Sequence, residues 1–120
     1  MPDTILLVED EYAALEVMCL LLAREGYHCL QAADGQEALE ILAAQPVDLV
    51  VTDYWMPRLD GLALCRRMQE DERWRHIPVI LMSASTVQDP VPPQVVASLT
   101  KPLLFTGLLD AVRKVLKPPA

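Results

Sequence analysis

The sequence predicts an α/β fold, in which a parallel β-sheet is covered by helices on both faces. Short continuous apolar runs recur along the chain, as is typical of strands buried on both faces. Segments with apolar residues at helical spacing separate most of these runs. The length of 120 residues suits one domain and leaves no room for a second. We therefore expect a single domain over residues 1–120, with 117–120 as its end or as the start of a linker.

The first half of the chain is expected to contain three strands and two helices. Asp34 is followed three residues later by Glu37, a pattern typical of a helix N-cap, and Gly26 is a helix-stop signal. On the first helix, the residues expected to face the core are Ala14, Val17, Met18, Leu21 and Leu22. The elements are expected as strands at 4–8, 28–32 and 48–53, and as helices from 11 to about 25 and from about 35 to 44.

The second half is expected to continue the alternation, with an interruption. Asp60 can cap a third helix, and a last amphipathic helix follows Lys101-Pro102. The segment 86–98 contains Pro90, Pro92 and Pro93, which exclude a normal helix through its centre because proline lacks the backbone donor. At most a short turn is expected near Pro93. The expected elements are a helix at 61–70 and strands at 79–82 and 95–100.

The net charge and the hydropathy of the chain limit the kinds of partner that it can bind. The net charge of −7 disfavours nucleic-acid binding, which needs clustered Lys and Arg, and suits a cation site. The start of the chain lacks the basic region of a signal peptide, and no apolar run reaches the roughly 18 residues of a membrane span. We expect a cytoplasmic domain that contacts neither nucleic acid nor membrane.

The three cysteines, Cys19, Cys29 and Cys65, are widely spaced in apolar segments. An odd number with no CxxC pair favours buried reduced thiols over a disulfide or a zinc site.

The expected strands carry chemically active residues at their ends. Parallel strands bring their carboxyl ends to one edge of the sheet. Carboxylates gathered there would repel, since two unit charges ~4 Å apart cost about 4 kcal/mol at an effective dielectric near 20. An oxygen-only site of this kind suits Mg²⁺. The residues are Glu9 and Asp10 after the first strand, Asp53 at the end of the third, Ser83 after the fourth and Lys101 after the fifth.

This set is typical of a site that transfers a phosphoryl group. Asp53 is central and is the expected nucleophile, with Lys101 as a fixed cation and Ser83 as a hydroxyl donor. Taken singly, each feature has a plainer interpretation: the acidic run 9–11 as a solvated turn, Ser83 and Ser85 as loop residues, and Lys101 as a surface lysine. Their joint placement at strand ends favours the site.

The chain resembles the receiver domain of two-component response regulators, CheY-like, over essentially its whole length. The resemblance implies a flavodoxin-like, doubly wound sheet of five strands. It also implies a signalling switch, not a free-standing enzyme, that takes a phosphoryl group from a sensor histidine kinase or a histidine phosphotransfer protein. The matching segments are LLVEDE, ADGQEAL, DLVVTDYWMPRLDGL, PVILMSA and TKPL.

Residue roles follow from that resemblance. Asp53 is implied as the phosphoacceptor, and Ser83 and Lys101 as the residues that contact the phosphoryl group. The bond before Pro102 is implied to be cis. The implied Mg²⁺ ligands are Glu9, Asp10, Asp53 and the backbone carbonyl of Trp55.

Three departures from the family pattern stand out. Ser98 occupies the position, three residues before Lys101, where an aromatic switch residue is usual. The interval before it is short and proline-rich, so the fourth helix is expected to be short or missing. Trp55 lies two residues after Asp53, and we expect Trp55 and Ser85 to tune hydrolysis of the phosphoaspartate, with Trp55 shielding it. Output is expected to avoid the family's common face of fourth helix, fifth strand and fifth helix.

Three other functions compete with this one. A degenerate receiver could act as a phosphorylation-independent interaction module. An aspartyl-phosphate hydrolase would need an acid two residues after the nucleophile, where this chain has Trp55. A cofactor binder would need a glycine-rich loop, and the four glycines are scattered. The cognate kinase, the output partner, an attached effector and a homodimer are left open.

Overall fold

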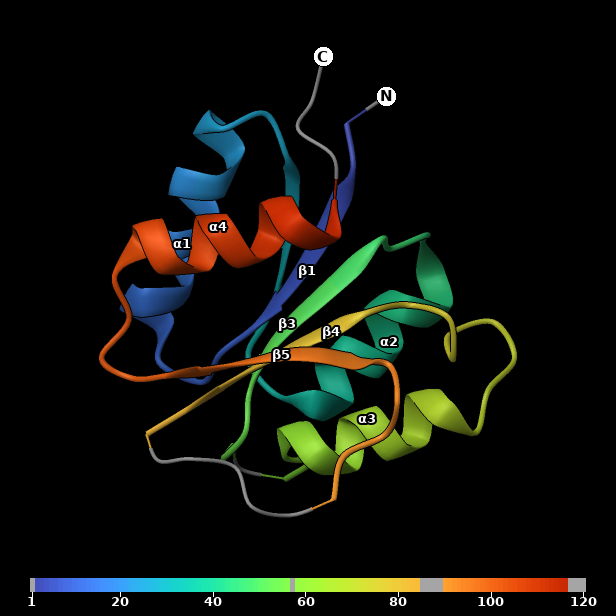
Figure 1. Ribbon diagram of the computed structural model, residues 1–120. Coiled ribbons are helices and arrows are strands. Elements are labelled where there is room, and N and C mark those ends of the chain that lie inside the picture. Colours follow the sequence, from blue (N-terminus) through green and yellow to red (C-terminus); the bar gives the residue numbers. More distant parts are fainter. Residues whose placement is uncertain (1, 57, 85–89, 117–120) are drawn as a thin grey trace.

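Five parallel strands form one sheet, in the order β2–β1–β3–β4–β5 (Figure 1). The computed structural model describes residues 2–56, 58–84 and 90–116. The expected doubly wound fold is confirmed. Its elements in chain order are β1 (Thr4–Val8), α1 (Tyr12–Arg24), β2 (His28–Ala32), α2 (Gly35–Ala44), β3 (Leu49–Asp53), α3 (Gly61–Gln69), β4 (Val79–Ser83), β5 (Val95–Thr100) and α4 (Phe105–Val115).

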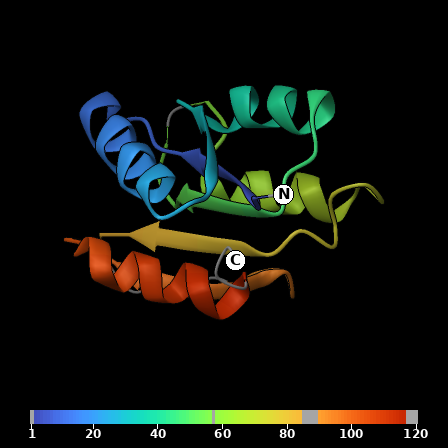
Figure 2. The same ribbon diagram turned by 90° about the horizontal axis from the view of Figure 1, so that it is seen from above.

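The helices cover the two faces of the sheet in pairs, with α1 and α4 on one face and α2 and α3 on the other (Figure 1). Alternate residues of a strand point to opposite faces. Leu6 and Val8 of β1 therefore pack toward α2 and α3, while Ile5 and Leu7 pack toward α1 and α4. All four are fully buried, which explains the continuous apolar run of this strand. Figure 2 shows α4 lying along β4 and β5 at one side of the sheet.

Local signals place the helix ends where the sequence predicts. The Asp34 side chain accepts a hydrogen bond from the Glu37 amide (2.9 Å), and Asp60 accepts one from the Ala63 amide (2.8 Å). Gly26, just beyond α1, has a φ of 97°, a left-handed conformation that favours glycine.

The connection from β4 to β5 contains no helix in its described residues, 84 and 90–94. The chain turns at 93–94 through a bond from the Val95 amide to the Pro92 carbonyl (3.0 Å), as expected near Pro93. Val96 is 51% exposed, and Ser98 is exposed on the same side of β5. Residues 85–89, including Ser85, lie outside the described residues.

The prediction of reduced thiols at Cys19 and Cys29 is wrong. A disulfide joins them, with their Cα atoms 5.6 Å apart, whereas Cys65 is a free buried thiol. They are ten residues apart in the sequence, but α1 folds back on β2 and brings the two side chains together. Burial raises the pKa of the Cys65 thiol to about 12.

The inward face of α1 differs in part from the prediction: Leu22 is buried and Met18 packs against the core as expected, but Val17 does not. Val17 is 56% exposed, and the buried residues are Leu15, Cys19 and Leu22. This helix is apolar over most of its surface, so spacing alone did not settle which stripe packs on the sheet. Among the described residues, no helix combines the length and apolar character needed to cross a bilayer.

Candidate phosphorylation and metal site

The strand ends bring the predicted site residues to one edge of the sheet. Asp53 ends β3, which lies between β1 and β4. Glu9 directly follows β1, and its amide donates to the Ala32 carbonyl (3.1 Å). Ser83 ends β4 and Lys101 directly follows β5. The sheet order therefore places Asp53 between the acidic turn and the lysine.

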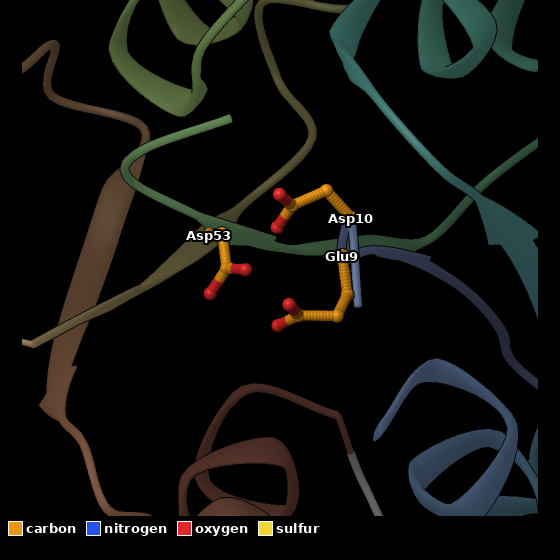
Figure 3. Close-up of side chains that lie close together, drawn as sticks. All are labelled: Glu9, Asp10 and Asp53. Carbon is orange, nitrogen blue, oxygen red and sulfur yellow. The ribbon is translucent and has the colours of Figure 1, made fainter. Parts of the chain in front are cut away.

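Three carboxylates face a common space at this edge (Figure 3). One oxygen each of Glu9, Asp10 and Asp53 lies within 4.8 Å of the other two. Glu9 and Asp53 are only 2% and 3% exposed, whereas Asp10 is exposed. Ionised acids this close repel one another, so a cation beside the cluster would stabilise it.

Lys101 supplies one cation. Its Nζ lies 2.6 Å from Asp53 Oδ1 and 3.2 Å from Glu9 Oε2. Its backbone amide donates to the Ser83 carbonyl (2.7 Å), which fixes it against the end of β4. The Lys101–Pro102 peptide bond is cis, as the resemblance implies. Ser83 itself is 5% exposed.

The electrostatics of the site favour cation binding. Burial raises the pKa of Asp53 to about 7; the hydrogen bond with Glu9 adds to this rise, and Lys101 opposes it. Burial alone would raise the pKa of Glu9, but its bonds to Asp53, the Glu11 amide and Lys101 lower it. Burial disfavours the charge on Lys101, yet Asp53 and Glu9 together raise its pKa. Near neutral pH Asp53 is therefore partly protonated, and a bound cation would displace that proton.

The donor set fits Mg²⁺. Three carboxylates, two of them buried and one open to solvent, leave coordination positions for water and for a ligand oxygen. Among the described residues, neither a cysteine nor a histidine joins the three acids in this group, so a soft metal is disfavoured. The residues that could hold the ion are Glu9, Asp10 and Asp53.

The remaining predicted residues lie around the site or away from it. The Trp55 side chain is 69% exposed, and its ring packs edge-on against that of Tyr54, with 5.2 Å between centroids. Ser98 lies within β5 on the side opposite Ala97 and Leu99, which pack toward α4. The structure therefore does not bring Ser98 into the carboxylate cluster.

The sequence did not predict one ion pair in the connection that follows Asp53. The Arg58 guanidinium forms an ion pair with the buried Asp34 carboxylate, 24 residues earlier. The sequence predicts Asp34 as a helix cap, but no local pattern predicts its interaction with Arg58.

Comparison with known proteins identifies the family. The family described as response regulator receiver domain matches residues 5–113. The chain belongs to this family. Receiver domains are components of two-component signal transduction, so the expected family is confirmed.

The relatives agree with this assignment. Response regulator GtcR of Aneurinibacillus migulanus is 39% identical over 84 residues, which cover 70% of this chain and 34% of GtcR. Response regulator MprA of Mycolicibacterium vanbaalenii is 35% identical over 124 aligned positions, covering 98% of this chain and 52% of MprA. This receiver domain thus spans about a third and about half of these two relatives.

A solved structure extends the similarity to the fold. Response regulator protein TrrA of Thermotoga maritima, in complex with Mg²⁺-BeF, matches with a TM-score of 0.85 at 28% identity. The match covers 95% of this chain and 99% of the TrrA chain.

Proposed function

We propose that this receiver domain accepts a phosphoryl group on Asp53 from a phosphohistidine donor in the presence of Mg²⁺, and that this switches its protein interactions. One observation carries the proposal. A buried carboxylate, Asp53, lies 2.6 Å from a lysine ammonium and within 4.8 Å of two further carboxylates, at the carboxyl edge of a parallel sheet. The similar TrrA structure is a complex with Mg²⁺-BeF, which supports Mg²⁺ binding by this domain.

Each site residue has a distinct role in the proposed phosphoryl transfer. An ionised Asp53 oxygen attacks phosphorus, the new O–P bond forms as the P–N bond to the donor imidazole breaks, and the electron pair stays on that nitrogen. Lys101 offsets charge on the phosphoryl oxygens, and the Ser83 hydroxyl donates to one of them. Mg²⁺, when bound by Glu9, Asp10 and Asp53, supplies further neutralisation of that charge.

The surface around the site suits a protein donor. Three large apolar side chains that lie within three residues of a site residue are exposed: Tyr12 by 68%, Trp55 by 69% and Leu104 by 76%. Exposed apolar groups beside a polar site are typical of protein contacts. They support a donor presented on a protein, such as a sensor histidine kinase or a histidine phosphotransfer protein.

The test is incubation with Mg²⁺ and a small acyl phosphate, followed by intact mass. We expect one phosphoryl group in Mg²⁺ and none when EDTA removes the metal. A chain that gains none in either condition would instead be a phosphorylation-independent interaction module, which the exposed Ser98 in place of an aromatic switch residue favours. Steady phosphate release over many turnovers would indicate a hydrolase; the indole of Trp55 offers no general acid or base for this.

A further inference from the structure

The connection between β3 and α3 is anchored at the end next to Asp53. The Gly61 amide donates to the Tyr54 carbonyl (2.9 Å), which closes the connection on itself. A Cβ at Gly61 would collide with the Asp53 carbonyl oxygen, so the start of α3 lies directly on the end of β3. Trp55 belongs to this connection.

The same connection is anchored a second time, to the N-terminus of α2. Arg58 donates to Asp34 Oδ2, while Asp34 Oδ1 caps α2 through the Glu37 amide. The Gly35 amide donates to the Leu59 carbonyl (3.1 Å), and a Cβ at Gly35 would collide with Leu59. The Asp34 side chain is 3% exposed and that of Arg58 is 72% exposed. A buried acid thus holds a solvent-facing arginine.

The backbone at Arg58 indicates that these contacts determine its conformation. Its φ is 67°, in the left-handed region that residues with a side chain rarely adopt. Such a conformation persists where the surrounding contacts outweigh its cost. Here the surrounding contacts are the ion pair of Arg58 with Asp34 and the hydrogen bond from Gly35 to the next residue, Leu59.

We infer that Asp34 and Arg58 are positioning residues for the metal site: their ion pair holds the start of α3, which lies on the Asp53 backbone, and so keeps the Asp53 carboxylate beside the other two acids. This inference rests on the proposed Mg²⁺ site. The pair acts through the backbone of the connection and contacts neither carboxylate partner of Asp53. Loss of the pair frees Arg58 to leave the left-handed region, so the cost appears as weaker metal binding.

The test measures Mg²⁺ affinity through the fluorescence of Trp55 in a Trp74→Phe background. Arg58→Ala removes the pair, and Asp34→Ser removes it while keeping a capping oxygen. We expect each to raise the Mg²⁺ dissociation constant about threefold to tenfold, and the double variant to match the larger single effect. Arg58→Lys should recover part of the loss. Affinities within twofold of the parent, or additive losses, would overturn the inference.

Arg73→Ala is the matched control. Arg73 also forms an ion pair with an acid close to it in the sequence, Asp71, and its side chain is 63% exposed. It lies in the segment between α3 and β4, and we expect its loss to leave Mg²⁺ affinity unchanged. An equal effect of Arg73→Ala would show a general charge effect and overturn the inference.

The outcome separates this inference from the proposed function. Mg²⁺ binding that weakens in Arg58→Ala, in a chain that accepts no phosphoryl group, would overturn the proposed function alone. Phosphorylation of Asp53 with unchanged Mg²⁺ affinity in the two variants would overturn the positioning role alone. A parent chain that binds no Mg²⁺ would overturn both.

Discussion

Asp53 combines burial with two opposing neighbours. Burial and Glu9 raise its pKa, while Lys101, 2.6 Å away, lowers it. The result is a carboxyl group that ionises near neutral pH, about 7, instead of near its ordinary value of 3.8. A nucleophile in this state is ready to ionise as soon as additional positive charge reaches the site.

The raised pKa predicts a pH-dependent stability cost. Between 3.8 and about 7 the folded state holds a proton that the unfolded state has lost, so stability falls as pH rises through this range. Without divalent metal, Asp53→Asn should raise the free energy of unfolding at pH 8 by on the order of 2 kcal/mol. The gain should shrink at pH 5. Urea unfolding in EDTA at both pH values measures this, and a gain that grew toward acid pH would contradict it.

Trp55 provides a second prediction for a single residue. Its exposed indole follows Asp53 by two positions, where it can restrict water from an acyl phosphate. Trp55→Ala should shorten the half-life of phosphorylated Asp53 about threefold to tenfold, equivalent to roughly 1 kcal/mol. The decay of the phosphorylated mass after donor removal measures this, with Trp74→Phe as the control. An unchanged half-life would exclude shielding.

The disulfide fixes the contact between α1 and β2. It closes a loop with a sequence separation of 10 between Cys19 and Cys29. A closed loop restricts the unfolded chain more than the folded one. The disulfide therefore stabilises the folded β1–α1–β2 unit, in which the acidic residues before α1 lie.

Reduction should lower the free energy of unfolding by about 2–3 kcal/mol. Urea unfolding with and without a phosphine reductant measures this. A variant carrying both Cys19→Ser and Cys29→Ser should have the free energy of unfolding of the reduced protein, and the reductant should not change it. If the wild-type transition did not move on reduction, this role of the disulfide would be disproved.

The connection from β4 to β5 bears on output. Its described residues form no helix, and Ser98 offers no aromatic ring to change rotamer. We therefore expect a phosphate mimic to alter amide exchange most in the β3–α3 connection and around Lys101, next to the proposed phosphoacceptor Asp53. Exchange mass spectrometry with and without the mimic tests this. Protection changes confined to residues 88–106 would show that output uses the β5 face.

Across the whole molecule, the features set by local pattern could be predicted. Buried parallel strands appear as apolar runs, and their carboxyl ends must meet at one edge. The sequence therefore predicts that Glu9, Asp53 and Lys101 lie together, and the Lys101 Nζ is 3.2 Å from Glu9 and 2.6 Å from Asp53. The caps at Asp34 and Asp60 followed from their spacing to the helix starts.

Features set by tertiary approach could not be predicted. The Cys19–Cys29 bond depends on how α1 packs back on β2, and because α1 is apolar over most of its surface, its sequence did not reveal which stripe faces inward. The Arg58–Asp34 pair depends on the path of a connection that has no periodic pattern. These contacts arise only once the sheet and helices are assembled.

The identity of the phosphoacceptor is tested most directly by intact mass of three proteins treated with Mg²⁺ and a small acyl phosphate. Wild type and Asp60→Asn should each gain one phosphoryl group, since asparagine also caps a helix and α3 is preserved. Asp53→Asn should gain none. A phosphoryl group on Asp53→Asn, or none on the wild type, would contradict the assignment of Asp53 as the phosphoacceptor.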